Sequence, residues 1–413
     1  MRRDVFITGV GVVSPAGSGG AIDGWQSLVD GHLFVRPLHT IKSMKPTGIC
    51  AGQLAHRAVP SGLEEHGRVC QIAVASADES LRCAGLSGGD TNGLDPRRSI
   101  VCIGTSKSYL DNNNLLDHRF PYEGYSSLKH LYPGFSASLD AAARLVSKRY
   151  GIAGGMHTAV AACATGTLAV IRGAQFIRDG DADWVVAGSS DASLHPLWLA
   201  AFERMGVLAQ PHAERGPAWA CRPFDRTRNG FVLGEGAGVL VLESSESVRQ
   251  RGSQPIARIA GWAVGTDPTG LAKVTPDGGP LARVIGLACE RSGYRTGQLS
   301  CVYAHGTGTI SNDLAETRAL RSILGNHVRK VPIVSLKGAM GHLLGAAGSV
   351  ELAFAALSCQ RRISPGTATL IEPDEELSDL RLPVTSFELD GNPILKTSLG
   401  FGGHLAAVVL ASA

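Results

Sequence analysis

Charged residues are scarce in this chain, at 18% of its 413 residues, and Lys and Arg (39) nearly balance Asp and Glu (36). Nucleic acid binding calls for a strongly basic surface, so this balance argues against nucleic acid as the main partner. Hydrophobic residues reach 44%, which excludes a disordered chain and supplies a large core. A chain of this length is expected to form two or three structural units, or one large fused core.

Long apolar runs are also missing. No uninterrupted apolar stretch of about 18 residues occurs, so we expect no membrane span. Arg2 and Arg3 precede an apolar run as in a signal peptide, but Asp4 and two glycines interrupt it and no A-x-A cleavage site follows. The sequence therefore predicts a cytoplasmic protein.

The nine cysteines include no C-x-x-C pair, and their odd number and wide scatter argue against both a disulfide framework and a zinc site. Most should be buried, reduced thiols, with one or two free to carry chemistry. Nucleotide motifs are lacking as well: Ser14 stands where a dinucleotide fingerprint needs its third glycine, Pro15 follows it, and no phosphate-binding loop occurs. We therefore expect no nicotinamide cofactor.

What is present is an alternation of short apolar runs and longer amphipathic stretches, which predicts an α/β fold. Its 52 glycines follow no short period and indicate turns and close backbone approaches. The predicted strands are 5–13, 99–104, 183–188, 237–243, 301–305, 331–336 and 404–411. The predicted helices are 21–30, 64–85, 138–150, 164–179, 280–292, 312–325 and 346–360.

An internal similarity divides the chain. An L-G-x-G turn leads into an apolar run at Leu233 and again at Leu399, 166 residues later. Together with the repeated strand–helix alternation, it predicts two related halves, 1–250 and 251–413.

Cys163 differs from the other cysteines in its setting. It follows a run of small residues and directly precedes the predicted helix 164–179. The positive end of a helix dipole lowers a thiol pKa and favours the thiolate nucleophile. The alternative is a small cysteine packed at a strand–helix junction.

Two histidines favour the nucleophile. His305 ends a predicted strand before a Gly-Thr loop, and His342 follows Lys337 between a predicted strand and a helix. Asn312 or Asp313 is expected to cap the intervening helix, which carries Glu316. Zinc is the competing use, but neither histidine has metal-ligand partners at short spacing, and cysteine with histidine also suits acyl transfer.

The ordered motifs A-C-A-T-G (162–166), H-G-T-G-T-x-x-N-D-x-x-E (305–316), L-K-G-A-x-G-H (336–342) and G-F-G-G-H (400–404) resemble those of the elongating β-ketoacyl-acyl-carrier-protein synthases of the thiolase superfamily. The resemblance spans essentially the whole chain. It implies a thiolase-like duplicated core in five layers, α-β-α-β-α, with the nucleophile in the first half and both histidines in the second. It also implies a homodimer.

The resemblance assigns roles to residues. Cys163 carries the acyl chain as a thioester and receives the carbanion left when malonyl-acyl-carrier protein loses carbon dioxide. His305 and His342 donate hydrogen bonds to the thioester oxygen of the malonyl group. Lys337 supports His342, and Glu316, Asn312 and Asp313 belong to the loop network. The backbone amides of Cys163 and Phe401 form the oxyanion hole, and Phe401 also acts as a gate. Thr307 and Thr309 contact the phosphopantetheine arm.

No cofactor is implied beyond the phosphopantetheine of the acyl carrier protein, and no catalytic metal; a structural monovalent cation is expected near Glu316. The acidic carrier protein calls for basic docking residues, and position favours Arg68, Lys129 and Arg204. Two other functions stay open: a heterodimer partner that shapes chain length, and a thiolase-type acyl-CoA enzyme. The presence of Cys163 and of two histidines favours the condensing enzyme.

Departures from the family pattern cluster around the gate and the acyl pocket. Thr397 and Leu399 stand in the family's N-S-F-G-F-G-G run, and Leu405 replaces a frequent Asn. The segment 104–109 replaces a glycine-rich stretch with one that holds Lys107 and Tyr109. We interpret these changes as a sign of a specialised pathway in fatty-acid or polyketide-type synthesis.

Overall fold

The computed structural model describes residues 3–17, 19–38, 48–54, 62–63, 66–86, 93–107 and 138–413. The first half contributes the strands β1 (Val5–Val13), β4 (Ser99–Gly104), β5 (Met156–His157), β6 (Trp184–Ala192) and β7 (Leu233–Ser244). The second half contributes β8 (Ala257–Thr266), β9 (Cys301–Tyr303), β10 (Ile333–Val334), β13 (Ile394–Gly400) and β14 (His404–Ala411). The described residues also form the short strands β2 (Arg36–Pro37), β3 (Cys50–Gly52), β11 (Ile363–Ser364) and β12 (Phe387–Glu388).

Among the described residues, the helices of the first half are α1 (Ala21–Val29), α2 (Arg68–Cys83), α4 (Ala141–Tyr150), α5 (Thr165–Asp179), α6 (Pro196–Arg204) and α7 (Ser245–Arg251). Those in the second half are α8 (Gly279–Ser292), α9 (Ile310–Leu324), α10 (Lys337–Met340) and α11 (Ala347–Arg361).

The two halves have the same strand order. The first runs β5-β4-β6-β7-β1 and the second β10-β9-β13-β14-β8, so in each half the third, second, fourth, fifth and first of these five strands lie side by side in that order. The sheets meet where Phe6 and Ile7 of β1 pair with Arg258 and Ala257 of β8. This repeat confirms the predicted duplicated α/β core, whereas the division at residue 250 stays a prediction.

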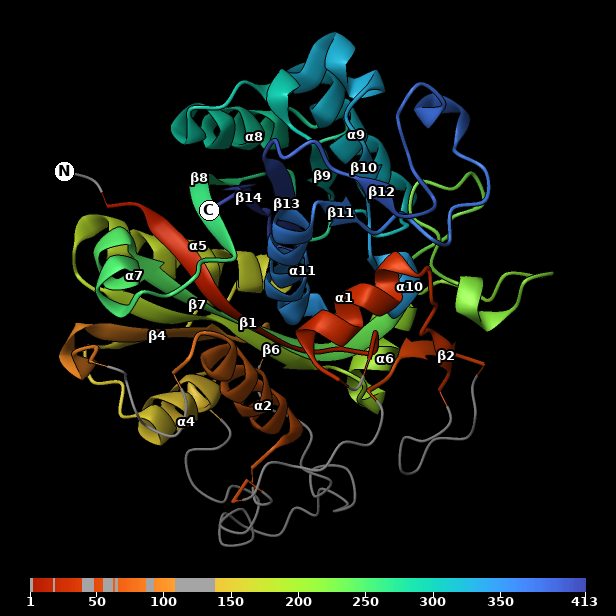
Figure 1. Ribbon diagram of the computed structural model, residues 1–413. Coiled ribbons are helices and arrows are strands. Elements are labelled where there is room, and N and C mark those ends of the chain that lie inside the picture. Colours follow the sequence, from red (N-terminus) through yellow and green to blue (C-terminus); the bar gives the residue numbers. More distant parts are fainter. Residues whose placement is uncertain are drawn as a thin grey trace, which may run out of the picture.

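Helices alternate with the sheets in five layers (Figure 1). The helices α8 and α9 cover the outer face of the second sheet, α2 and α4 cover that of the first, and α5 and α11 lie between the sheets. In α11 every residue from Ala347 to Cys359 is buried. A helix that is buried on all sides belongs in a core, and α11 accordingly packs against strands of both halves.

The predicted strand 5–13 coincides with β1, and 404–411 coincides with β14. The structure corrects other boundaries: the helix predicted at 64–85 begins at Arg68, and β8 and β13 were not predicted. Both unpredicted strands carry small or polar residues (ARIAGWAVGT and ILKTSLG), which weaken the apolar pattern that marks a buried strand.

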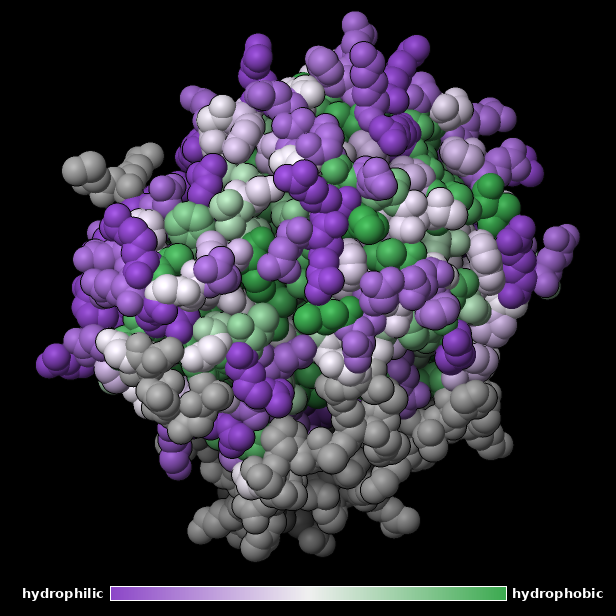
Figure 2. All heavy atoms as spheres, in the orientation of Figure 1, coloured by the Kyte–Doolittle hydropathy of each residue, from purple (hydrophilic) through white to green (hydrophobic). Residues whose placement is uncertain are grey.

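Hydrophilic side chains dominate the described surface seen in Figure 2, with hydrophobic residues scattered among them. Among the described residues, no helix is long and apolar enough to cross a membrane.

Candidate functional site

Cys163 lies in a single 3-10 turn, residues 162–164, that leads directly into α5. Ala162 precedes it with φ 46°, a left-handed backbone that costs a non-glycine residue about 1 kcal/mol. The Thr165 hydroxyl accepts the Ala161 N–H at 2.8 Å and donates to the Ala162 carbonyl at 2.7 Å, which fixes the turn. A Cβ at Gly400 would lie 2.5 Å from the Ala161 carbonyl oxygen, so the glycine lets the second half reach the turn.

The Cys163 side chain is buried, and burial raises the pKa of its thiol to about 11. Lys107 and Lys337 oppose this shift by their charge, and the Phe401 backbone N–H opposes it as a hydrogen-bond donor to the sulfur. The expected lowered pKa is therefore wrong, because the loss of hydration outweighs the helix dipole and the cations. At neutral pH the resting group is the thiol.

The two predicted histidines are brought together. The rings of His305 and His342 stand edge to face, with centroids 5.4 Å apart, and both side chains are buried. The backbone N–H of His305 donates to Glu316 Oε1 at 2.8 Å, and the backbone N–H of His342 donates to the Val232 carbonyl at 2.7 Å. Burial, followed by the charge of Lys337, holds the pKa of both imidazoles well below the ordinary value. Each ring is therefore neutral and has one N–H donor.

A buried charge network lies at the same site. Lys337 Nζ lies 2.7 Å from Glu351 Oε1, and Lys396 Nζ lies 2.8 Å from Glu351 Oε2. Both lysines act on both histidines through their charge. Glu351 and Lys396 were missed from the sequence, although a carboxylate inside the apolar helix 346–360 was visible there. Lys396 lies in β13, a strand that was not predicted.

The loop after β9 is tied to α9 through Asp313. Its Oδ1 accepts the N–H groups of Thr307 at 3.0 Å and Gly308 at 3.2 Å, and the Asn312 amide at 3.1 Å. The hydroxyls of Thr307 and Thr309 lie 2.9 Å apart. The predicted capping role is wrong, since α9 begins with Thr309 as its N-cap and Asp313 turns inward to the loop.

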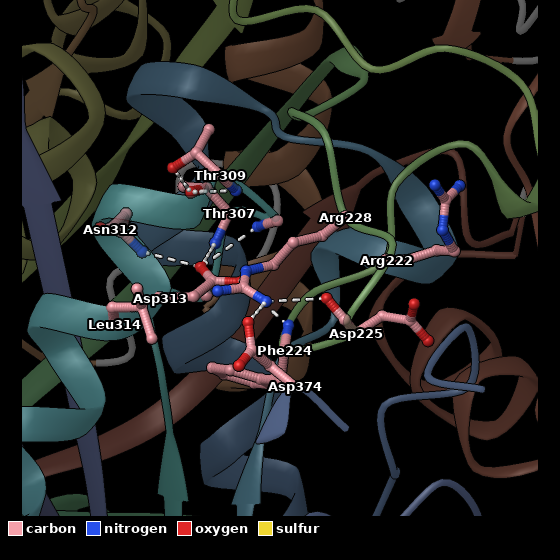
Figure 3. A network of polar contacts seen from close by, with 12 residues as sticks. Arg222, Phe224, Asp225, Arg228, Thr307, Thr309, Asn312, Asp313, Leu314 and Asp374 are labelled. Carbon is pink, nitrogen blue, oxygen red and sulfur yellow. Dashed lines mark hydrogen bonds and ion pairs between the residues drawn. The ribbon is translucent and has the colours of Figure 1, made fainter. Parts of the chain in front are cut away.

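Arg228 joins this loop to the first half, and Figure 3 shows it between two carboxylates. Its Nη1 lies 2.6 Å from Asp374 Oδ2 and its Nε lies 3.6 Å from Asp313 Oδ2. The same Nη1 donates to the Asp225 carbonyl at 2.8 Å, and the Phe224 N–H donates to Asp313 Oδ2 at 2.9 Å. Burial nevertheless raises the pKa of Asp313 to about 6.

An open cavity connects these parts to solvent. Its wall includes six of the predicted residues: Cys163, Thr307, Thr309, Asn312, His342 and Phe401. Leu399 and Leu405, two of the departures from the family pattern, line it as well. The site therefore combines a thiol, a neutral imidazole and two hydroxyls in one chamber that opens at the surface.

Two protein-family models match the sequence of this chain. The β-ketoacyl synthase N-terminal domain matches residues 2–247, and the C-terminal domain matches residues 256–370. The chain belongs to the β-ketoacyl synthase family. As the sequence predicted, this ketosynthase is an acyltransferase of the thiolase fold, in the class that serves polyketide and fatty-acid synthesis.

Similar proteins come from both kinds of pathway. The ketosynthase is 33% identical to the tetracenomycin polyketide synthase ketoacyl synthase alpha subunit of Streptomyces glaucescens, over 99% of this chain and 97% of the other. It is 30% identical to 3-oxoacyl-[acyl-carrier-protein] synthase 2 of a Synechocystis strain, over 98% and 96%. Among solved structures, a type II ketosynthase in complex with its acyl carrier protein superposes with a TM-score of 0.89, at 28% identity and full coverage of both chains.

The predicted docking residues have different settings. Arg68 forms a two-point ion pair with the buried Glu235, at 2.6 and 2.7 Å, whereas Arg204 is exposed at the end of α6. Lys129 lies outside the described residues, as does Tyr109. All nine cysteines are free thiols, and the described residues hold no cluster of His, Cys, Asp and Glu that suits a metal ion.

Proposed function

We propose that this ketosynthase condenses an acyl group on Cys163 with malonyl-acyl-carrier protein to give a 3-oxoacyl-acyl-carrier protein. The observation that carries the proposal is the meeting of the Cys163 thiol, the Phe401 N–H and the neutral imidazole of His342 around one open chamber, with the neutral ring of His305 edge to face against that of His342. A chain-length-shaping partner needs no nucleophile, so a buried thiol in this setting favours the condensing enzyme.

In the first step Cys163 attacks the thioester of the acyl-carrier protein. The sulfur–carbonyl bond forms, the pantetheine sulfur leaves, and the thiol proton passes to it. The Phe401 and Cys163 amides stabilise the oxyanion of the tetrahedral intermediate. Phe401 also stands in the chamber wall beside Cys163, where a change of its side chain opens or closes the way to the acyl group.

In the second step the malonyl carboxylate leaves as carbon dioxide, and its bonding electron pair forms an enolate. The N–H groups of His305 and His342 stabilise the enolate oxygen. The enolate carbon then attacks the Cys163 thioester, and the Cys163 sulfur leaves as a thiolate that takes a proton from water. Lys337 supports the histidines through its field, and Glu316 holds the His305 backbone.

Thr307 and Thr309 bind the phosphopantetheine arm at the chamber wall. Asp313 accepts the Thr307 backbone N–H, and the Asn312 amide donates to Asp313. The partners we propose are an acyl carrier protein and a second copy of the chain, and the location we propose is the cytoplasm. Of the two docking candidates that the structure describes, Arg204 is the more exposed. Sedimentation velocity of the purified chain distinguishes a homodimer from a monomer that awaits another subunit.

The monovalent cation implied by the resemblance does not fit the carboxylates present. Glu316 already accepts the N–H groups of His305 and Gly306 and the Thr397 hydroxyl, and the Asp313 carboxylate faces Arg228. The Arg228 guanidinium thus supplies the positive charge beside Asp313 that a bound cation would supply, and no step of the mechanism involves a bound ion.

The decisive experiment is the replacement of Cys163 by Ala, with Cys50→Ala as the matched control, since Cys50 is a buried thiol of the same apolar cluster. Incubation with acyl-carrier protein and intact-protein mass spectrometry should show the acyl adduct in the native protein and the control, but not in the Cys163 variant. Full condensing activity of the Cys163 variant would falsify the proposal.

Two further assays separate the alternatives. The chain alone should decarboxylate malonyl-carrier protein, whereas a pure chain-length partner should not. Labelling of Cys163 by acyl-CoA at the rate seen with carrier protein would instead indicate a thiolase-type enzyme.

A further inference from the structure

Lys396 is the second fully buried lysine at the site, beside Lys337. It lies on β13 opposite Tyr303 of β9, the strand that ends two residues before His305. Burying an ammonium costs a large free energy unless oxygens surround it and an opposite charge balances it. The partners of Lys396 therefore indicate its role.

The Lys396 ammonium has oxygen partners of the kind that a monovalent cation binds. Its Nζ lies 2.8 Å from Glu351 Oε2 and donates to the backbone carbonyl of Thr397. Main-chain carbonyl and carboxylate oxygens also bind potassium and free ammonium ions, which carry the same single charge. The side chain of Lys396 thus occupies oxygens that such an ion would otherwise bind.

The buried charges here balance only with Lys396 included. Two lysines and two glutamates lie close together, and all four side chains are buried: Lys337, Lys396, Glu351 and Glu316. Glu316 Oε1 accepts the Thr397 hydroxyl at 2.6 Å and the backbone N–H of His305 at 2.8 Å. Without Lys396, one buried carboxylate would lack a counter-charge.

Glu351 connects Lys396 to the second histidine segment. Its Oε1 lies 2.7 Å from Nζ of Lys337, on the short helix α10 that ends two residues before His342. The carboxylate therefore bridges two ammonium groups, one from β13 and one from α10. Loss of either ammonium would free the carboxylate to move toward the other.

We propose that Lys396 is a positioning residue whose ammonium takes the place of an exchangeable monovalent cation and fixes Glu351, and through it Lys337. The family resemblance implied such an ion near Glu316, and this chain supplies the charge from its own side chain instead. The effect expected on decarboxylation rests on the proposed function, whereas the effect expected on stability does not.

The test uses Lys396→Ala, which leaves a space beside Glu351 that an ammonium or potassium ion can enter. Urea unfolding is measured in ammonium, potassium and tetramethylammonium chloride at equal ionic strength, because tetramethylammonium is too large for the space. An ion that binds only the folded chain stabilises it. The unfolding midpoint of the variant should therefore be higher in the two small cations, and that of the native protein should not depend on the cation.

Two further variants separate the charge from the space. Lys396→Met removes the charge but fills the space, so its midpoint should fall and should not respond to the cation. Leu395→Ala opens a cavity at the neighbouring buried position of β13 and removes no charge. Its midpoint should also be lower than that of the native protein, and equal in the three salts.

Malonyl decarboxylation gives a second readout. In tetramethylammonium chloride it should be about tenfold slower in Lys396→Ala than in the native protein, as for a residue that orients the groups in contact with substrate. Ammonium chloride should restore part of the lost rate. The acyl adduct on Cys163 should still form, since the cations that act on this thiol are Lys107 and Lys337.

A native protein that is more stable in potassium or ammonium than in tetramethylammonium contradicts the role of Lys396, because an ion then still binds. A Lys396→Ala chain that has one midpoint in all three salts, or that folds in none of them, contradicts it as well. Absence of the Cys163 adduct from the native protein overturns the proposed function instead, and leaves the stability result for Lys396 standing.

Discussion

At the scale of single residues, burial decides the chemistry of the site more than local charge does. The thiol of Cys163 and the imidazoles of His305 and His342 all shift toward their neutral forms. For the histidines the cations Lys337 and Lys396 add to the effect of burial, whereas for the thiol the nearby cations oppose it. The site thus consists of two neutral imidazole donors and a neutral thiol, surrounded by the buried charges of Lys337, Lys396 and Glu351.

The first prediction concerns the thiol. Because burial raises the pKa of Cys163 to about 11, the thiolate fraction keeps growing as the pH rises toward that value. Alkylation of Cys163 by iodoacetamide, followed by mass spectrometry of its peptide, should therefore accelerate steadily from pH 7 to pH 10. An alkylation rate that does not change between pH 7 and pH 10 contradicts this prediction and would instead indicate a thiol pKa below about 7, as the helix dipole alone predicts.

The histidines are predicted to serve decarboxylation rather than acyl transfer. His305→Ala and His342→Ala should each lower malonyl decarboxylation about 100-fold or more, since each removes a donor to the enolate oxygen. Both variants should still form the acyl adduct on Cys163. Measuring carbon dioxide release and the adduct on the same samples separates the two steps; loss of the adduct in both variants argues against this division of roles.

At the scale of elements, the site depends on contacts between segments far apart in sequence. Arg228, in the segment between α6 and β7, reaches Asp313 on α9 and Asp374 near the end of the chain. Asp313 in turn holds the amides of the loop that carries Thr307. The geometry of the threonine loop is therefore set by an arginine of the first half.

Removal of this arginine should destabilise the protein strongly. Arg228→Met leaves the buried Asp313 without its cation, and breaking a buried pair in this way costs about 3–5 kcal/mol. The control is Arg226→Met, two residues away, whose ion pair with Glu372 is more than half exposed and is worth at most about 1 kcal/mol. Urea unfolding measures the loss in free energy of unfolding for both variants. Equal losses would show that the Arg228 ion pair contributes no more to stability than the exposed Arg226 pair.

At the scale of the whole molecule, the two halves share one interior. A single cluster of buried residues contains Val10 of β1, Ala174 of α5, Phe354 of α11 and Val408 of β14. The central layer therefore belongs to both halves, although each half repeats the same strand order.

From this we predict that the segment 1–250 does not fold alone, because it lacks α11 and would expose the inner faces of its sheet and of α5. The full chain should unfold in one transition, monitored by near-ultraviolet circular dichroism in urea. A cooperative transition of the isolated segment, at the same urea concentration as in the full chain, would show that the halves are independent.

The sequence by itself determined the fold class, the family and the residues that meet at the chamber, because strand alternation, turn glycines and ordered motifs are local patterns. It placed Cys163 before a helix and both histidines after strands. It did not predict β8 and β13, whose small and polar residues become strand-like only when paired with β14 and β9. It also gave no sign of which charges meet.

Only the tertiary structure decided the electrostatics. Lys337 and Lys396 share Glu351, Arg228 pairs with Asp313, and Lys107 pairs with Asp191. The partners in these pairs lie between 14 and 85 positions apart in the sequence. The raised pKa of Cys163 likewise depends on how completely other segments exclude water from it. Desolvation and long-range charge pairing are properties of the packed molecule, and no local pattern encodes them.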